Sequence, residues 1–232
     1  MEHQEGDLEL IGPFHALTGV WLIIIQHGFD AKISDPDEVA KFLKAKLGRS
    51  LSEVKWTRSS INVIEDASDA LREYRSFPDE SSSRVGAAYL RFFGALGSVY
   101  QLAAGIKSLW SLYRANEYSA IADRIESHRL YDLRNRLGAH MVNYKRDKSG
   151  PQHFHVITQM DMFRRDGKRS FVASDLGYQE FDMVHEIVDC EKLYGLVLLE
   201  LTALMSAKVI TRRSDHFEWS QERIEFARRT FS

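Results

Sequence analysis

Apolar residues recur three and four positions apart over most of the chain, which is the period of helices that bury one face. A first predicted helix follows Asp35-Pro36, because aspartate caps a first turn and proline fits its first position, and it extends to about residue 47. A second runs from about residue 51 to the Phe77-Pro78 pair. Ser50 and Glu53 at its start are typical of a capping box.

Four later segments also have the helical period. Residues 83–114 predict a central buried helix, and we expect four aromatic residues of this segment in the core, namely Phe92, Phe93, Tyr100 and Trp110. The same segment contains Gly86, Gly94, Gly97 and Gly105, which indicate close contact with a neighbouring backbone, since glycine otherwise weakens a helix. Further helices are predicted over residues 119–145, 178–209 and 217–230.

One segment departs from the helical period. Apolar and polar residues alternate from Gln152 to Met162, which is the period of a half-buried strand. Asp166-Gly167 is a hairpin turn signal, and residues 168–173 can return as the second strand. The sequence therefore predicts a mainly α fold, with residues 1–232 as a single helical domain and a β-hairpin inserted at about residues 152–174.

The composition excludes several classes of protein. The chain has 232 residues with 44% hydrophobic and 28% charged content, which is ordinary for a globular protein and excludes a disordered one. No apolar run approaches the roughly 20 residues that span a bilayer, and the first ten residues are acidic where a secretory signal carries positive charge. Cys190 is the single cysteine, so no internal disulfide forms. We expect a cytoplasmic protein with no membrane segment.

Positive charge is concentrated in one part of the chain. Residues 124–169 contain eleven Lys and Arg against five Asp and Glu, although the whole chain has a net charge of −2. Four of the nine histidines lie in the same segment. A polyanion would bind here, and the alternative is a solvated basic face with no partner.

A short motif lies inside this basic segment. Arg134 is followed by Asn135 and, after five intervening residues, by His140. This pattern resembles the signature of the HEPN superfamily, helical domains that are found in many prokaryotic toxins and defence systems. The resemblance implies an HEPN-like helical bundle and a metal-independent endoribonuclease of toxin or defence type, with Arg134 and His140 as catalytic residues. The inserted hairpin is not part of the common core that the resemblance implies.

Helix geometry indicates how such a site could be completed. An apolar stripe on the predicted helix comprises Leu130, Leu133, Leu137, Met141 and Tyr144. At about 100° per residue, Arg134 and His140 lie about 60° to either side of Leu137, so they do not face each other within one helix. If the stripe packs against its own copy in a homodimer, Arg134 of one chain can approach His140 of the other.

The residue types fit RNA cleavage through the 2′-hydroxyl. Histidine titrates near neutral pH and can act as base or acid, and a guanidinium stabilises charge on phosphate oxygens. One such histidine per chain cannot easily be both base and acid, which again favours a dimeric site. Asn135 and Arg136 are predicted in supporting roles, while His128 has no sequence neighbour that indicates catalysis. We predict neither a cofactor nor a metal site.

The sequence also suggests partners. Basic residues after the motif and around the predicted hairpin turn are candidates for binding a phosphate backbone, namely Lys145, Arg146, Arg164, Arg165, Lys168 and Arg169. RNA and an antitoxin or regulatory protein are the expected partners. The alternative hypothesis is a non-catalytic helical dimer that binds nucleotide, RNA or a protein partner through the same groove. In the simplest alternative, Arg134 and His140 only rim a dimer interface.

Overall fold

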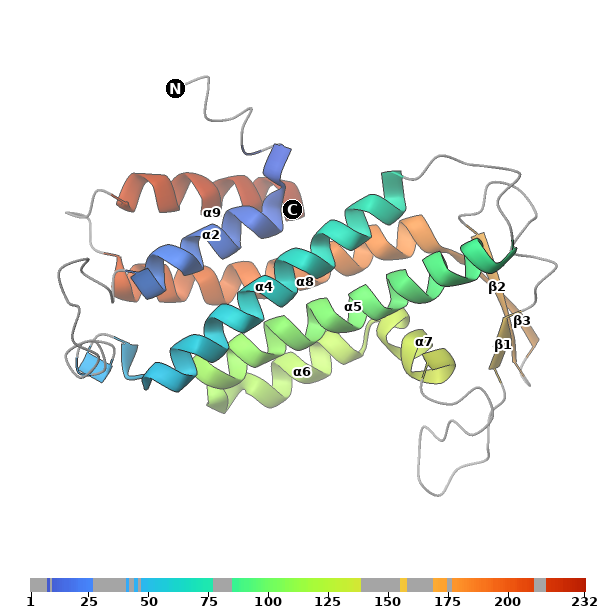
Figure 1. The fold of residues 1–232 in the computed structure, drawn as a ribbon, viewed down its shortest axis with the longest axis horizontal. Helices are drawn as coiled ribbons and strands as arrows, with labels where there is room; N and C mark the ends of the chain where they lie inside the picture. Colours follow the sequence, from blue (N-terminus) through green and yellow to red (C-terminus); the bar gives the residue numbers. More distant parts are fainter. Residues whose placement is uncertain are drawn as a thin grey trace. The chain divides into compact units, whose positions relative to one another are not determined.

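The computed structural model describes residues 8, 10–26, 41, 44, 45, 47–76, 85–138, 155–157, 169–174, 177–210 and 216–232, and this part of the chain is mainly helical (Figure 1). The helices are α2 (Pro13–Gln26), α4 (Leu51–Ser76), α5 (Val85–Tyr113), α6 (Tyr118–Glu126), α7 (Arg129–Gly138), α8 (Met183–Val209) and α9 (Phe217–Phe231), with a 3₁₀ turn at Ala115–Glu117. The strands are β1 (His155–Ile157), β2 (Arg169–Ser174) and β3 (Gly177–Asp182).

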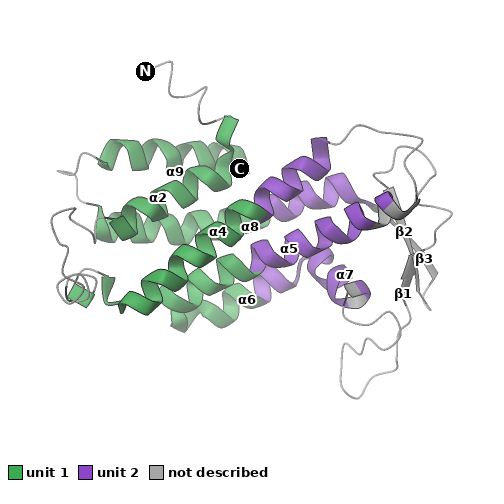
Figure 2. Ribbon diagram, in the orientation of Figure 1, with its two compact units in different colours: residues 1–66, 104–122, 192–232 green, residues 67–103, 123–191 purple. Residues whose placement is uncertain are grey.

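The chain divides into two compact units (Figure 2). Unit 1 comprises residues 1–66, 104–122 and 192–232, and unit 2 comprises residues 67–103 and 123–191. Helices α4, α5, α6 and α8 each contribute residues to both units. The prediction of one domain over the whole chain stays a prediction. None of the described helices is both long and apolar enough to cross a membrane.

Two buried tryptophans organise unit 1. The indole N–H of Trp21 on α2 donates to Thr202 Oγ1 on α8 at 2.9 Å, and that of Trp110 on α5 donates to the carbonyl of Val197 at 3.2 Å. Thr202 Oγ1 in turn donates to the Leu198 carbonyl. A buried indole leaves its N–H unsatisfied unless a partner is supplied, so these bonds fix where α2 and α5 meet α8.

Helices α2 and α9 pack against each other in the same unit. The rings of Phe14 and Phe231 meet edge to face with their centres 5.2 Å apart. Gly195 on α8 makes room for this pair, because a Cβ there would collide with the Phe231 ring. The last residues of the chain are therefore part of the core of unit 1.

Unit 2 contains the small sheet. Its strands are antiparallel in the order β1-β2-β3, with His155 paired to Ser174 and Ser174 paired to Gly177. Strand β1 lies against α7, so the sheet and the helix that carries the Arg-Asn motif are neighbours. Both β1 and β2 fall within the range for which a hairpin is predicted. The proposed turn at Asp166-Gly167 lies outside the described residues, and the hairpin as a unit stays a prediction.

Several predicted helices are confirmed. The second predicted helix is α4, the central one is α5, and the last one is α9. The capping box at the start of α4 is also present, since the Ser50 backbone N–H donates to Glu53 Oε2 at 2.7 Å and the Glu53 N–H donates to Ser50 Oγ at 3.3 Å. Most of the first predicted helix, after Asp35-Pro36, lies outside the described residues. Helix α2 is not among the predicted elements.

The prediction of one helix over residues 119–145 is wrong at Ser127 and His128. Helix α6 ends at Glu126, where Ser127 Oγ donates to the carbonyl of Arg124 at 2.8 Å. His128 then begins α7, because its Nδ1 accepts the backbone N–H of Leu130 at 3.1 Å. A side chain that accepts a first-turn N–H is what starts a new helix, so the chain breaks and restarts here. Residues after Gly138 lie outside the described part.

The start predicted for the long helix is also wrong. Residues 177–182 form β3 rather than helix, because they pair along their length with β2. Helix α8 begins at Met183, and Asp182 Oδ1 accepts the backbone N–H of His185 at 3.2 Å. This is the geometry of an aspartate N-cap, so Asp182 closes the strand and opens the helix.

The glycines of α5 differ in their surroundings. A Cβ on Gly105 would lie 2.8 Å from Ile64 Cγ1 and 3.0 Å from the Ser60 carbonyl oxygen on α4, which confirms the expected backbone contact at this position. A Cβ on Gly94 or Gly97 would meet no atom within 4 Å, so the same expectation is wrong there. Of these three glycines, Gly105 is the one that lies at the close approach of α4 to α5.

We expect Gly105→Ala and Gly94→Ala to change stability in opposite directions. Overpacking against Ile64 and the α4 backbone should lower the free energy of unfolding of Gly105→Ala by about 1–3 kcal/mol. Gly94→Ala should raise it by up to about 1 kcal/mol, because alanine favours the helix and the new methyl meets open space. Urea unfolding followed by circular dichroism measures both, and equal stability of the two variants would contradict the packing argument.

Candidate functional site

Helix α7 is anchored by one apolar face. Leu130, Leu133 and Leu137 are all buried, while Arg134 and Asn135 lie at half-buried positions beside them. The three leucines recur at helical spacing, so they hold α7 against the rest of unit 2 and fix the direction in which the Arg134 side chain leaves the helix. Arg134 and Asn135 are thus presented by a packed helix and not by a loop.

Arg134 is held by two contacts. Its guanidinium carbon lies 3.9 Å from the centre of the Tyr100 ring on α5, and its Nη1 donates to Asn135 Oδ1 at 3.2 Å. The first is a cation–π contact and the second restrains the fork of the guanidinium. Among the described residues, no carboxylate forms an ion pair with Arg134. Its positive charge is therefore positioned but not neutralised by the part of the chain that is described.

Tyr100 corrects an expectation about the core. Phe92 and Trp110 of α5 are buried and Phe93 is half-buried, but Tyr100 remains 36% exposed. Its ring stacks on that of Tyr131 with 5.7 Å between the centres and 25° between the planes. Spacing along α5 did not distinguish Tyr100 from its buried neighbours, because the partners that hold it come from α7. It is the residue of this cluster that sequence reasoning missed.

The leucine stripe does not have the role that the sequence suggested. Its described members, Leu130, Leu133 and Leu137, are already buried within a single chain. They consequently offer no free apolar surface to a second copy. The other two members of the stripe, Met141 and Tyr144, lie outside the described residues.

Other predicted site residues are described only in part or not at all. Arg136 lies on α7 and Arg169 is the first residue of β2, where it pairs in register with Asp182. His140, Lys145, Arg146, Arg164, Arg165 and Lys168 lie outside the described residues. Arg134 and Asn135 are therefore the predicted site residues that the structure brings together.

A charged cluster surrounds the start of α7. Arg129 Nη1 lies 2.7 Å from Glu186 Oε1 on α8. Burial lowers the pKa of His128, and the nearby carboxylates of Glu186 and Asp189 act in the opposite direction. His128 therefore has charged neighbours that its sequence context did not indicate. Because its Nδ1 accepts the Leu130 N–H, the neutral ring serves as the cap of α7.

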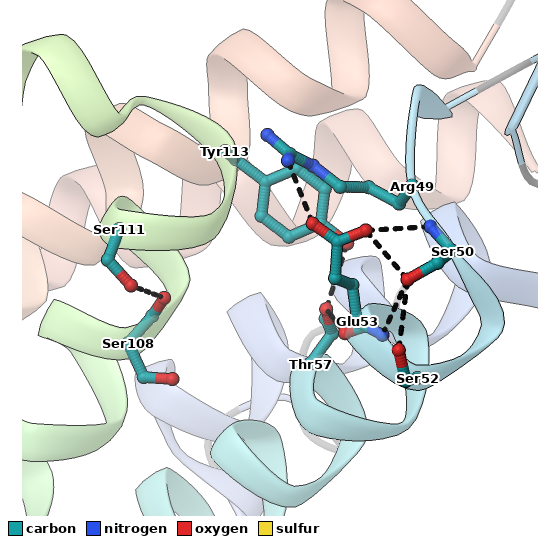
Figure 3. A network of polar contacts seen from close by, with 8 residues as sticks. All are labelled: Arg49, Ser50, Ser52, Glu53, Thr57, Ser108, Ser111 and Tyr113. Carbon is teal, nitrogen blue, oxygen red and sulfur yellow. Dashed lines mark hydrogen bonds and ion pairs between the residues drawn. The ribbon is translucent and has the colours of Figure 1, made fainter.

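A second polar cluster lies in unit 1 around the start of α4 (Figure 3). Glu53 Oε1 accepts Arg49 Nη1 at 3.1 Å, and its other oxygen closes the capping box with Ser50, which lowers the pKa of Glu53. The Arg49 guanidinium lies 5.3 Å from the centre of the Tyr113 ring, whose hydroxyl bonds Thr57 at 2.9 Å. These contacts join α4 to α5, and Arg49 Nε is the atom of the cluster that stays buried without a hydrogen-bond partner among the described residues.

The described residues contain no group of three or more histidine, cysteine, aspartate or glutamate side chains that could hold a metal ion. The thiol of Cys190 is buried. Its neighbour Glu191 is only 8% exposed and pairs with Arg75 Nη2 on α4 at 3.2 Å. Burial raises the pKa of Glu191 to about 7, although Arg75 and Arg72 lower it.

Comparisons with protein-family models, with curated proteins and with solved structures find no match to this chain. The function is therefore argued from the residues themselves. Within the described part, the cluster of Tyr100, Tyr131, Arg134 and Asn135 is the candidate site, because it combines an exposed aromatic ring with a fixed guanidinium.

The raised pKa of Glu191 predicts that the stability of the fold depends on pH. The unfolded chain loses the Glu191 proton near pH 4.5 and the folded chain near pH 7, so the free energy of unfolding should fall by about 3 kcal/mol as the pH rises between these values. Glu191→Gln does not titrate and should lack this component. Urea unfolding of both proteins at pH 4.5, 6 and 8 measures the difference. The same pH slope in the two proteins would show that Glu191 does not cause it.

Proposed function

We propose that this chain is a metal-independent endoribonuclease of the HEPN type, acting as a toxin or defence effector in the prokaryotic cytoplasm. The observation that carries the proposal is Arg134, which belongs to the Arg-Asn…His motif, is held by Tyr100 and Asn135, and has no carboxylate partner among the described residues. A guanidinium that is fixed and not neutralised suits the phosphate of an RNA chain.

The proposed reaction uses the RNA's own 2′-hydroxyl. A base removes its proton, the oxygen attacks the adjacent phosphorus, and the bond to the 5′-oxygen breaks while an acid protonates the leaving oxygen. In our proposal, His140 provides the proton transfer and Arg134 stabilises the charge on the phosphate oxygens in the transition state. Asn135 orients Arg134, as their 3.2 Å hydrogen bond supports, and Arg136 supplies further positive charge. The products are a 2′,3′-cyclic phosphate and a 5′-hydroxyl.

The segment around the sheet has a supporting role in the proposal. Strand β1 contacts α7, the helix that carries Arg134. We propose that Arg164, Arg165, Lys168 and Arg169, with Lys145 and Arg146 after the motif, bind the RNA backbone. An antitoxin or regulatory protein would then act by covering this basic surface.

We expect purified protein to cleave mixed RNA in the presence of EDTA and to leave 2′,3′-cyclic phosphate ends. His140→Ala and Arg134→Ala should each lower the cleavage rate at least about 100-fold, because they remove proton transfer and charge stabilisation. Arg58→Ala, which removes an exposed charge from α4 in unit 1, is the matched control and should cleave normally. Cleavage that persists in His140→Ala would remove that residue from the mechanism.

The alternative function is a non-catalytic module that binds RNA, nucleotide or a protein partner. It is favoured by the exposed ring of Tyr100 beside Arg134, because that pair can hold a ligand whether or not a reaction follows. This alternative is supported if RNA stays intact while binding is salt-sensitive and weakened by Arg134→Ala. A helical partner protein with an incidental basic segment would show neither result.

We propose that the nuclease acts as a homodimer, since a second copy supplies the second histidine. The copies would meet beside the buried leucines of α7 and not through them. His140→Ala should then inhibit wild-type protein when the two exchange subunits. With a tenfold excess of the variant, few wild-type chains keep a wild-type partner, so activity per wild-type chain should fall about tenfold.

Co-refolding of the two proteins allows the exchange, and mixing them just before the assay is the control. Activity per wild-type chain that stays undiminished after both procedures would mean that each chain works alone. RNA ends are counted by gel electrophoresis in both cases.

A further inference from the structure

Tyr100 is an aromatic residue on a partly exposed side of α5. Val99 and Leu102 are fully buried, whereas Tyr100 is 36% exposed and Gln101 beside it is also exposed. Its hydroxyl makes no hydrogen bond to the described residues, so the residue is not placed there to satisfy a polar partner. The ring is nevertheless fixed, because Tyr131 stacks on it and Arg134 lies 3.9 Å from its centre.

We call Tyr100, Tyr131 and Arg134 the platform, because they combine a partly exposed aromatic ring with a positive charge. A ligand that covered the exposed part of the Tyr100 ring would gain the free energy of burying apolar surface. Arg134 keeps guanidinium N–H groups beyond the one that Asn135 accepts, and no described carboxylate pairs with it. The platform thus has an aromatic ring for stacking and a hydrogen-bond donor for an anion, and the two lie within a few ångströms of each other.

A ligand that uses both features has a planar π system next to a phosphate, which is the chemistry of a nucleotide. Bases in a duplex are covered by their neighbours, so only an unpaired base offers a face for stacking. We infer that the Tyr100–Tyr131–Arg134 platform binds one unpaired nucleobase of single-stranded RNA, with the base stacked on Tyr100 and the adjacent phosphate at Arg134. This inference rests on the proposed function through Arg134, which both share.

The experiment uses full-length His140→Ala protein, so that the RNA stays intact, and a single-stranded RNA of about 12 nucleotides with 2-aminopurine at one position. Stacking quenches 2-aminopurine fluorescence, so binding should quench the probe. In this background Tyr100→Leu should weaken binding about 5- to 100-fold and abolish the quench. Tyr100→Phe should keep both, because the ring remains. Tyr118→Leu is the matched control, since Tyr118 is also 36% exposed but lies on α6.

An abasic RNA separates stacking from a purely structural role of Tyr100. If Tyr100 stacks on a base, Tyr100→Leu should not weaken binding of RNA that lacks the base at the contacted position. If Tyr100 only positions Arg134, the loss is the same with and without the base, and the inference is overturned. Equal binding of single-stranded and duplex RNA would also overturn it.

The two proposals fail in different ways. If Tyr100→Leu leaves both the cleavage rate and RNA binding unchanged, the platform is refuted and the nuclease proposal is retained. If the wild-type protein cleaves no RNA, but base-dependent RNA binding is lost in Tyr100→Leu, the platform is retained and the nuclease proposal is refuted. Circular dichroism of each variant confirms that the helices are intact.

Discussion

Helix α5 buries apolar residues along most of its length, and these residues stabilise the fold only where neighbouring elements cover them. Trp110 illustrates the requirement, because its ring is fully buried and its N–H finds the carbonyl of Val197 on α8. Gly105 illustrates it differently, since the absence of a side chain lets the α4 backbone approach. The positions of α4 and α8 in unit 1 follow from covering this one helix.

Tyr100 lies on a partly exposed side of α5, beside the exposed Gln101. The residues that hold its ring come from α7. Helix α7 in turn is fixed by its buried leucines, so the packing that stabilises unit 2 also sets Arg134 beside Tyr100. The candidate site is in this sense a by-product of packing, and a substitution that loosened α7 would move the guanidinium before it unfolded the protein.

Features with local causes could be predicted from the sequence. The start of α4 follows from Ser50 and Glu53, which lie three positions apart, and its end precedes Phe77-Pro78. Helix α2 was not predicted, because an apolar run with several β-branched residues does not separate helix from strand. Strand β3 was missed because its pairing with β2 is not local, although Asp182 carries a capping signal at the correct place. His128 breaks the predicted 119–145 helix by the same kind of capping contact.

Local sequence likewise predicts one part of the candidate site, and the other part depends on contacts between distant residues. Arg134 and Asn135 follow from a motif of neighbouring residues, whereas Tyr100 emerges only from the fold that brings α5 to α7. Charge counting has a similar limit. Arg129 and Arg134 contribute equally to the basic segment, yet Arg129 is paired with Glu186 at 2.7 Å, while no described carboxylate pairs with Arg134. A neighbouring carboxylate weakens the attraction of an arginine for a phosphate, so the two arginines would offer different net charges to an anion although they count equally in the sequence. The local excess of positive charge therefore overstates what a polyanion would meet, and the contacts of each arginine decide which of them can bind it.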